Sequence, residues 1–300
     1  MKSKLIKNPH VSEGTPTTHS ELALPHVAML MLSIGTVWRL MDIFVFGLGG
    51  SEFNVMPSKL GPLLIILGYF WVFRKSEFDS VLGLSTRDWR IQLPIGVLIG
   101  LVIVMGIDML SVVLYAIFFN PAYPLNITIV GPLLLLYMFG FFAINAIFEE
   151  VLFRGLLQNS LMRFLSPGRA ILLSSLIFGI WHACWPFANG LEGTTLITEI
   201  AKMVAFSAVI GAFFGLYYHS FSKEKTLLGT ISAHTMLNFV NEGFKLGPEP
   251  TAQGPDFSFA DPNLMIVTFL LFGIIFALLF LMVKTFDIEM VKRKLLDYLA

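Results

Sequence analysis

Residues 130–160 of the chain read VGPLLLLYMFGFFAINAIFEEVLFRGLLQNS. The first nineteen of these residues carry no charge, and a helix of about 20 predominantly apolar residues is long enough to cross a bilayer. Glu149, Glu150 and Arg154 follow within the same apolar run. A charge inside a membrane costs about 2.5–3.5 kcal/mol on insertion scales. The stretch therefore predicts a membrane-spanning helix whose charged residues have a partner or a function.

Similar apolar runs lie on both sides of this stretch. They cover 27–48, 57–74, 92–119, 168–187, 196–220, 226–243 and 264–284. Together with 130–160, which is too long for a single crossing, they predict about eight transmembrane helices. The composition agrees, because only 13% of the residues are charged, against about 25% in soluble proteins. The expected fold class is all-α, a polytopic membrane protein whose helices form one bundle.

The charged residues between the runs predict the domain organisation and the orientation. Residues 1–22 are polar and are expected to form an N-terminal tail, 23–286 the helical bundle, and 287–300 a C-terminal tail. Lys and Arg concentrate in alternate connections, whereas 120–129 contains neither. Because positively charged loops stay in the cytoplasm, both termini are expected there.

Charge and cysteine content exclude several classes of function. The formal net charge is zero, which gives no indication of nucleic-acid binding. The single cysteine, Cys184, cannot form an internal disulfide framework or a multi-cysteine metal site.

The first polar motif is the Glu149-Glu150-x-x-x-Arg154 sequence. Glu150 and Arg154 are four residues apart, so they share a helix face and can form an ion pair. Glu149 lies about 100° further round the helix and is free to act elsewhere, for example as a general base. The alternative is a structural ion-pair patch at the inner end of a span.

Two further motifs place histidines in later spans. Phe178 and His182 are four residues apart in one, and His234 and Asn238 are four apart in the other. His182 alone could be a structural histidine that bonds a backbone carbonyl or water. His234 and Asn238 could be polar contacts between helices, which membrane bundles often use.

The three motifs together favour catalysis. One carboxylate, two histidines and an amide supply a base to activate water and donors to stabilise an oxyanion. Glu149, His182 and His234 could also bind a metal, although the chain has no His-Glu-x-x-His sequence typical of zinc proteases.

Other charged residues inside the spans have simpler interpretations. Arg39 and Asp42, three residues apart, could pair on one helix face. Asp108 stands alone in its span and should have a polar partner in the bundle. Glu199 and Lys202 lie near the end of a span and can reach the interface.

The order Glu-Glu-x-x-x-Arg, Phe-x-x-x-His and His-x-x-x-Asn on successive apolar segments resembles the CAAX protease and bacteriocin-processing family, also called the abortive-infection family, which includes the type II CAAX prenyl endopeptidase. The resemblance covers residues 130–243. It implies an eight-span bundle, a prokaryotic plasma-membrane location and an intramembrane glutamic endopeptidase that forms no covalent intermediate. It further implies that Glu149 and His182 activate water and that His234 and Asn238 form the oxyanion hole. Glu150, Arg154 and Phe178 would support the site.

The resemblance also bears on partners and cofactors. The implied substrate is a membrane peptide or protein, with prenylated and bacteriocin-like peptides as candidates, and the lipid bilayer is the other partner. No cofactor and no nucleic acid are expected, and a metal at Glu149, His182 and His234 is the less favoured alternative. Two non-protease functions remain open: a non-catalytic immunity or scaffold protein that keeps the motifs, and a transporter or proton relay. The transporter is ranked last, because no paired halves with broken spans are visible.

Overall fold

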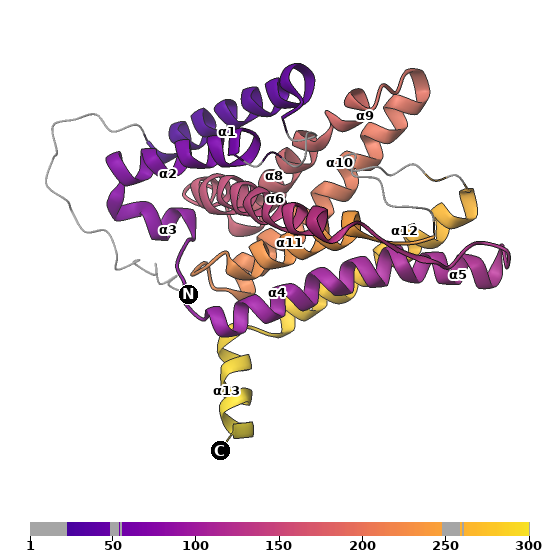
Figure 1. Cartoon of the computed structure of the whole chain (residues 1–300). Helices are drawn as coiled ribbons and strands as arrows, with labels where there is room; N and C mark the ends of the chain where they lie inside the picture. The colour runs from indigo at the N-terminus through magenta and orange to yellow at the C-terminus, as the bar shows by residue number, and fades with distance from the viewer. Residues whose placement is uncertain (1–22, 49–53, 55, 248–258, 260, 300) are drawn as a thin grey trace, which may run out of the picture.

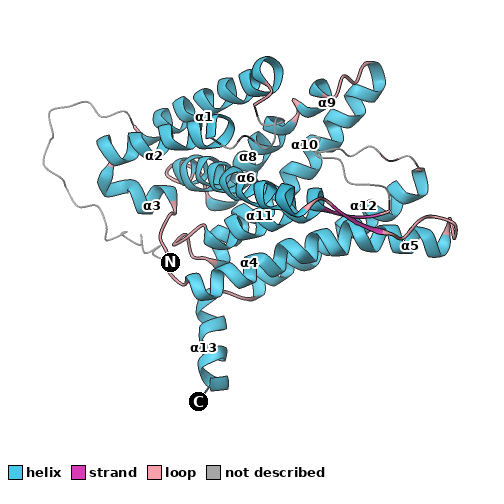
Figure 2. Cartoon of the chain, in the orientation of Figure 1, coloured by secondary structure: helices cyan, strands magenta, loops and turns pink. Residues whose placement is uncertain are grey.

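The structure of the protein is a computed structural model that describes residues 23–48, 54, 56–247, 259 and 261–299. The predicted tail 1–22 lies outside the described residues. The described chain is a bundle of helices with one two-stranded ribbon (Figures 1 and 2). The all-α class is therefore confirmed.

The helices are α1 (Leu24–Met41), α2 (Gly61–Phe73), α3 (Phe78–Leu82), α4 (Trp89–Val104), α5 (Leu110–Phe118), α6 (Pro132–Glu150), α7 (Asn159–Leu161), α8 (Pro167–His182), α9 (Trp185–Ala188), α10 (Gly193–Leu216), α11 (Leu228–Gly243), α12 (Pro262–Thr285) and α13 (Ile288–Leu299). Turns of π-helix adjoin several of them, at Asp42–Phe46, Met56–Leu60, Met105–Met109, Val151–Gln158 and Tyr217–Phe221. A three-residue 3₁₀ turn, Lys75–Glu77, precedes α3. Strands β1 (Ile127–Ile129) and β2 (Phe244–Leu246) pair antiparallel, with Thr128 opposite Lys245.

Six helical segments of the described chain are long and apolar enough to cross a membrane. They are Leu24–Phe46, Trp89–Phe118, Pro132–Leu161, Pro167–Ala188, Gly193–Phe221 and Pro262–Thr285. The other two predicted spans correspond to shorter helices, Pro57–Phe73 and the 16-residue α11. A polytopic membrane bundle is confirmed, whereas the count of eight spans is not.

The centre of the bundle is the end of α6 and the π-helical segment that continues it. All eight residues of Val151–Gln158 are buried, and α6 lies in the middle of the bundle in Figure 1. A helix buried on every side has no lipid-facing surface. The carboxylates of Glu149 and Glu150, directly before this segment, are therefore placed inside the protein.

Glycines allow the histidine-bearing helices to approach their neighbours closely. A Cβ atom on Gly100 of α4 would lie 2.6 Å from the Ala233 carbonyl oxygen of α11. A Cβ on Gly179 of α8 would lie 2.5 Å from the Val204 carbonyl oxygen of α10. Small residues at such crossings are typical of membrane helix pairs. These crossings hold α11 and α8, and therefore His234 and His182, against fixed neighbours.

The predicted C-terminal tail forms the helix α13, which projects from the bundle in Figure 1. Ion pairs link its start to two connections of the bundle. Lys223 lies 3.1 Å from Asp287, and Lys292 lies 2.7 Å from Asp88. The Met290 backbone amide and the Lys223 ammonium hold the pKa of Asp287 below its ordinary value. Lys223 is 43% exposed, so salt should screen its pair with Asp287, whereas Lys292 and Asp88 are half-buried.

Candidate active site

Glu149, in the last turn of α6, is buried with polar groups at both of its oxygens. Its Oε1 atom lies 3.4 Å from Arg39 Nη1. Its Oε2 atom lies 3.6 Å from His234 Nε2 and 3.8 Å from His182 Nε2. Three helices far apart in sequence therefore bring one arginine and both motif histidines to this carboxylate.

His182 is the last residue of α8, and its ring orientation follows from a local hydrogen bond. Its Nδ1 atom lies 2.9 Å from the carbonyl oxygen of Phe178, one turn earlier. A carbonyl oxygen can only accept, so Nδ1 carries the hydrogen. The Nε2 atom then faces Glu149 and, in a neutral ring, presents a lone pair.

His234 and Arg154 both bind Glu150. The Glu150 Oε1 atom accepts hydrogen bonds from Arg154 Nη1 at 3.0 Å and from His234 Nδ1 at 2.9 Å. The ion pair expected from the four-residue spacing is therefore present. It includes the histidine of α11, which joins the first motif to the third.

Phe178 forms the aromatic wall between these groups. The Arg154 guanidinium lies 4.1 Å from the centre of its ring, within the range of cation–π attraction. Its ring centre is 4.5 Å from that of His182 and 6.2 Å from that of His234. The residue expected to pack beside the site therefore contacts both histidines and the arginine.

Three buried motif atoms, Glu149 Oε2, Glu150 Oε2 and Arg154 Nη2, have no hydrogen-bond partner among the described residues. The buried Glu149 Oε2 accepts no hydrogen bond from any residue that the structure describes, because 3.6 and 3.8 Å exceed hydrogen-bond distances. Polar groups at this spacing are commonly bridged by water. Asn238 lies one turn after His234 on α11, is half-buried, and is not hydrogen-bonded to another described residue.

The sequence interpretation missed two cations beside Glu149. It offered Asp42 as a partner for Arg39, whereas the structure places the buried Arg39 guanidinium on Glu149. Asp42 accepts a hydrogen bond from Ser58. Lys59 is also buried, and it lies within electrostatic reach of Glu149 and Arg39. The available signal was a charge inside each of the first two apolar runs. The spacing of Arg39 favoured Asp42 as its partner, and Lys59 has no acidic residue three or four positions away.

The other intramembrane charges lie outside this cluster. Glu199 and Lys202 form an ion pair on α10. Asp108 is half-buried in its π-helical turn. Among the described residues, no group of three or more His, Cys, Asp or Glu side chains is arranged to hold a metal ion.

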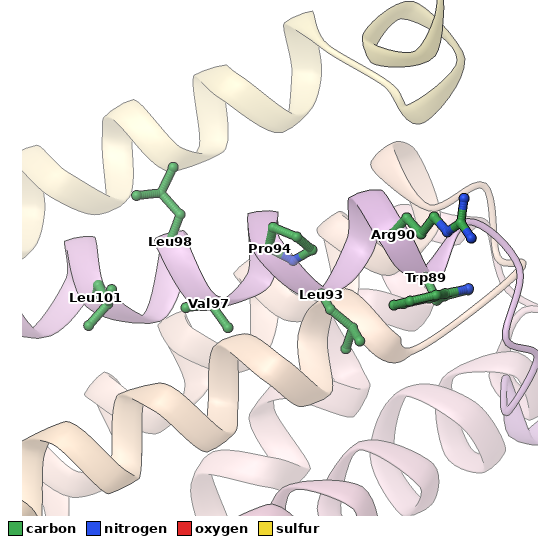
Figure 3. A pocket seen from close by; sticks show the side chains of 7 residues that line it. All are labelled: Trp89, Arg90, Leu93, Pro94, Val97, Leu98 and Leu101. Atoms are coloured by element: carbon green, nitrogen blue, oxygen red, sulfur yellow. The ribbon is translucent and has the colours of Figure 1, made fainter. Parts of the chain in front are cut away.

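Two pockets of the described chain are lined by residues outside the motifs. One, of about 500 Å³, lies along α4, where Figure 3 shows the side chains of Trp89, Arg90 and Leu93 beside Pro94, Val97, Leu98 and Leu101. A second, of about 460 Å³, lies along α1 and includes Trp38 and Asp42. The α4 pocket has one charged residue, Arg90, and no combination of base and donors. The buried cluster around Glu149 is therefore the stronger candidate for chemistry.

One comparison with known proteins supports the resemblance. Residues 131–240 match a family model described as Type II CAAX prenyl endopeptidase Rce1-like. This range contains all three motifs and nearly coincides with the predicted protease-like core at 130–243, so the family resemblance is confirmed for this segment. No curated protein matches the chain. The family points to a membrane endopeptidase that acts on membrane-embedded proteins, and the six apolar helices agree with an integral membrane protein.

Proposed function

From the Rce1-like character of residues 131–240, we propose that this protein is an intramembrane glutamate-dependent endopeptidase. It hydrolyses a peptide bond in a membrane-associated or lipidated peptide or protein, and it uses water rather than a covalent nucleophile. The observation that carries the proposal is the buried Glu149 Oε2, which has no donor among the described residues and faces two imidazole Nε2 atoms.

Glu149 and His182 are the proposed activators of the water. A water molecule at Oε2 would be within reach of the His182 Nε2 lone pair, which the Nδ1 bond to Phe178 directs inward. As the water oxygen attacks the scissile carbonyl carbon, its proton passes to Glu149. The proton is then given to the leaving amine when the C–N bond breaks. This division of work is general acid–base catalysis by one carboxylate.

His234 and Asn238 are the proposed oxyanion donors. Because its Nδ1–H is donated to Glu150, His234 can donate from Nε2 only as an imidazolium. The Asn238 amide, one turn further along α11, supplies a second donor. Preorganised donors of this kind stabilise the charge that develops on the carbonyl oxygen.

The decisive experiment replaces the proposed base. Glu149→Gln keeps the shape of the side chain but removes its ability to accept a proton, so kcat/KM should fall by about 10²–10⁴-fold. The measurement uses purified protein in proteoliposomes with an internally quenched peptide that carries a farnesylated cysteine. The matched control is Glu199→Gln, which changes a buried carboxylate elsewhere in the membrane. Cleavage by Glu149→Gln at the wild-type rate would disprove the proposal.

Further arms of the experiment address the substrate and the alternatives. If the farnesylated peptide is not cut, membranes of cells that express wild type or Glu149→Gln are compared by proteomics, and the substrate is the peptide that accumulates uncut in the variant. Activity that a chelator removes and zinc restores would favour the metal-dependent alternative. A partner complex or phenotype that survives Glu149→Gln and His182→Ala would favour a non-catalytic scaffold, and proton-coupled uptake in liposomes would favour a transporter.

A further inference from the structure

Arg39 belongs to α1, which lies outside the segment that matches the protease family. Its guanidinium makes two polar contacts in the site. Nη1 donates to Glu149 Oε1 at 3.4 Å, and Nε donates to the Cys184 sulfur at 3.4 Å. One rigid side chain thus links the end of α6 to the turn that follows His182.

Two tryptophans hold the guanidinium in place. Its central carbon lies 5.3 Å from the ring centre of Trp181 and 5.4 Å from that of Trp185. Both distances are within the range of cation–π attraction. An arginine with its planar group fixed on two rings has little freedom to leave Glu149.

The packing of α1 fixes the backbone that carries Arg39. Gly35 lies one turn earlier, where a Cβ atom would be 3.1 Å from the Trp181 ring and 3.4 Å from Leu152. The buried α1 residues Val27 and Met31 belong to the same apolar cluster as Leu152. The position of Arg39 is therefore set by close contact between α1 and the centre of the bundle.

We infer that Arg39 is a positioning residue for Glu149, an inference that rests on the proposed function. By binding Oε1, it turns Oε2 toward the Nε2 atoms of His182 and His234. In this role the arginine acts through the Glu149 carboxylate. The first span thereby completes a site whose other residues lie within 131–240.

The first test measures kcat and KM separately for variants of Arg39. Arg39→Met removes the guanidinium but keeps an extended side chain, and a misplaced catalytic group can cost about 10²-fold in rate. In the proteoliposome assay we expect kcat to fall by about that factor while KM changes less than about twofold. Arg39→Lys keeps the charge but not the two-pronged contact, so its kcat should be intermediate.

The matched control is Lys59→Met. Lys59 is a buried cation within electrostatic reach of Glu149, but within the described chain it forms no ion pair with that carboxylate. If only positive charge near the site mattered, both substitutions would lower kcat equally. An equal loss would therefore overturn the inference, and a loss restricted to Arg39→Met would support it.

The second test measures the contact without activity. Arg39→Met leaves the Glu149 charge buried and unpaired, so the melting temperature of the detergent-solubilised protein should drop. In a Glu149→Gln background the same substitution should cause less than about half of that drop, because no charge is left unpaired. Equal drops in both backgrounds would overturn the inference.

The two proposals fail in distinguishable ways. If the wild type cleaves and Arg39→Met keeps its kcat within about twofold, far below the effect expected of a misplaced base, only the positioning role is overturned. If the wild type cleaves no substrate in either arm of the earlier experiment, the proposed function fails, and the positioning role fails with it.

Discussion

At the scale of single residues, Glu150 joins the first motif to the third. One of its oxygens accepts from Arg154 and from His234, although 84 residues separate Glu150 from His234. Glu149, about 100° further round the helix, faces Arg39 and the two Nε2 atoms. The two adjacent carboxylates therefore have different partners and different roles: Glu150 is structural, and Glu149 is the proposed catalytic base.

This division predicts a strong effect of Arg154 on stability. Arg154→Met leaves the fully buried Glu150 without its guanidinium, and breaking a buried ion pair costs about 3–5 kcal/mol. The double variant Glu150→Gln, Arg154→Met should recover part of the lost stability, because position 150 no longer carries a carboxylate without its guanidinium. The free energy of unfolding in detergent measures both effects.

An exposed arginine serves as the control for this prediction. Arg163 pairs with Glu77 at 3.5 Å and is 48% exposed, so Arg163→Met should cost less than about 1 kcal/mol. Equal losses for Arg154→Met and Arg163→Met would contradict the view that Arg154 compensates a buried charge.

At the scale of helices, the crossing of α4 and α11 determines where His234 lies. Gly96 and Gly100 of α4, four residues apart, let the two backbones approach closely: a Cβ atom on Gly96 would clash with the Gly229 carbonyl oxygen of α11, and one on Gly100 would lie 2.6 Å from that of Ala233. Interfaces of this kind depend on close backbone contact rather than on apolar burial, since lipid is as apolar as leucine. The crossing then places His234, directly after Ala233, toward Glu150.

Gly100→Ala should therefore be disproportionately harmful. Its new methyl group would lie 2.6 Å from the Ala233 carbonyl oxygen, so the helices must separate, at about 1–3 kcal/mol for such overpacking. We also expect reduced cleavage, because α11 carries both proposed oxyanion donors. Thermal unfolding and the cleavage assay are the measurements.

The same substitution at Gly140 is a matched control. Gly140 lies within α6, and a Cβ atom there would meet nothing within 4 Å. Gly140→Ala should be neutral or stabilising by up to about 1 kcal/mol, since alanine favours a helix over glycine. A larger loss of stability for Gly140→Ala than for Gly100→Ala would contradict the view that the close α4–α11 contact is needed for stability.

At the scale of the whole molecule, the orientation in the membrane stays a prediction from charge. The alternation of Lys- and Arg-rich connections places both termini in the cytoplasm. Ion pairs bind the start of α13 to the two connections that contain Lys223 and Asp88. The C-terminus and these basic connections are therefore expected on one side of the membrane.

Reporter fusions test this orientation. An alkaline phosphatase, which is active only outside the cytoplasm, should be inactive when fused after Ala300 and active when inserted after Asn189, between α9 and α10. A green fluorescent protein fused after Ala300 in place of the phosphatase should fluoresce. Phosphatase activity at the C-terminus would reverse the predicted topology.

The sequence by itself determined the properties that depend on neighbours along a helix. Apolar runs identify membrane helices because a bilayer requires about 20 residues with few charges. The spacing of Glu150 and Arg154 predicts their ion pair because residues four apart share a helix face. The order of the three motifs was enough to predict the family whose model residues 131–240 match. The roles assigned to Glu149, His182, His234 and Asn238 stay predictions for the experiments above.

Only the tertiary structure decided which helices meet. Arg39 and Asp42 are three residues apart, so helical spacing favoured that pair, but packing of α1 against Val151–Gln158, the segment that continues α6, brings Arg39 to Glu149, 110 residues away. Nor did spacing predict that Glu150 binds His234, or that α11 is a helix of only 16 residues. The physical reason is that helical periodicity predicts only the helix face on which a side chain lies. Its partner depends on the neighbouring helix opposite that face, and the packing of small and apolar residues determines which helix this is.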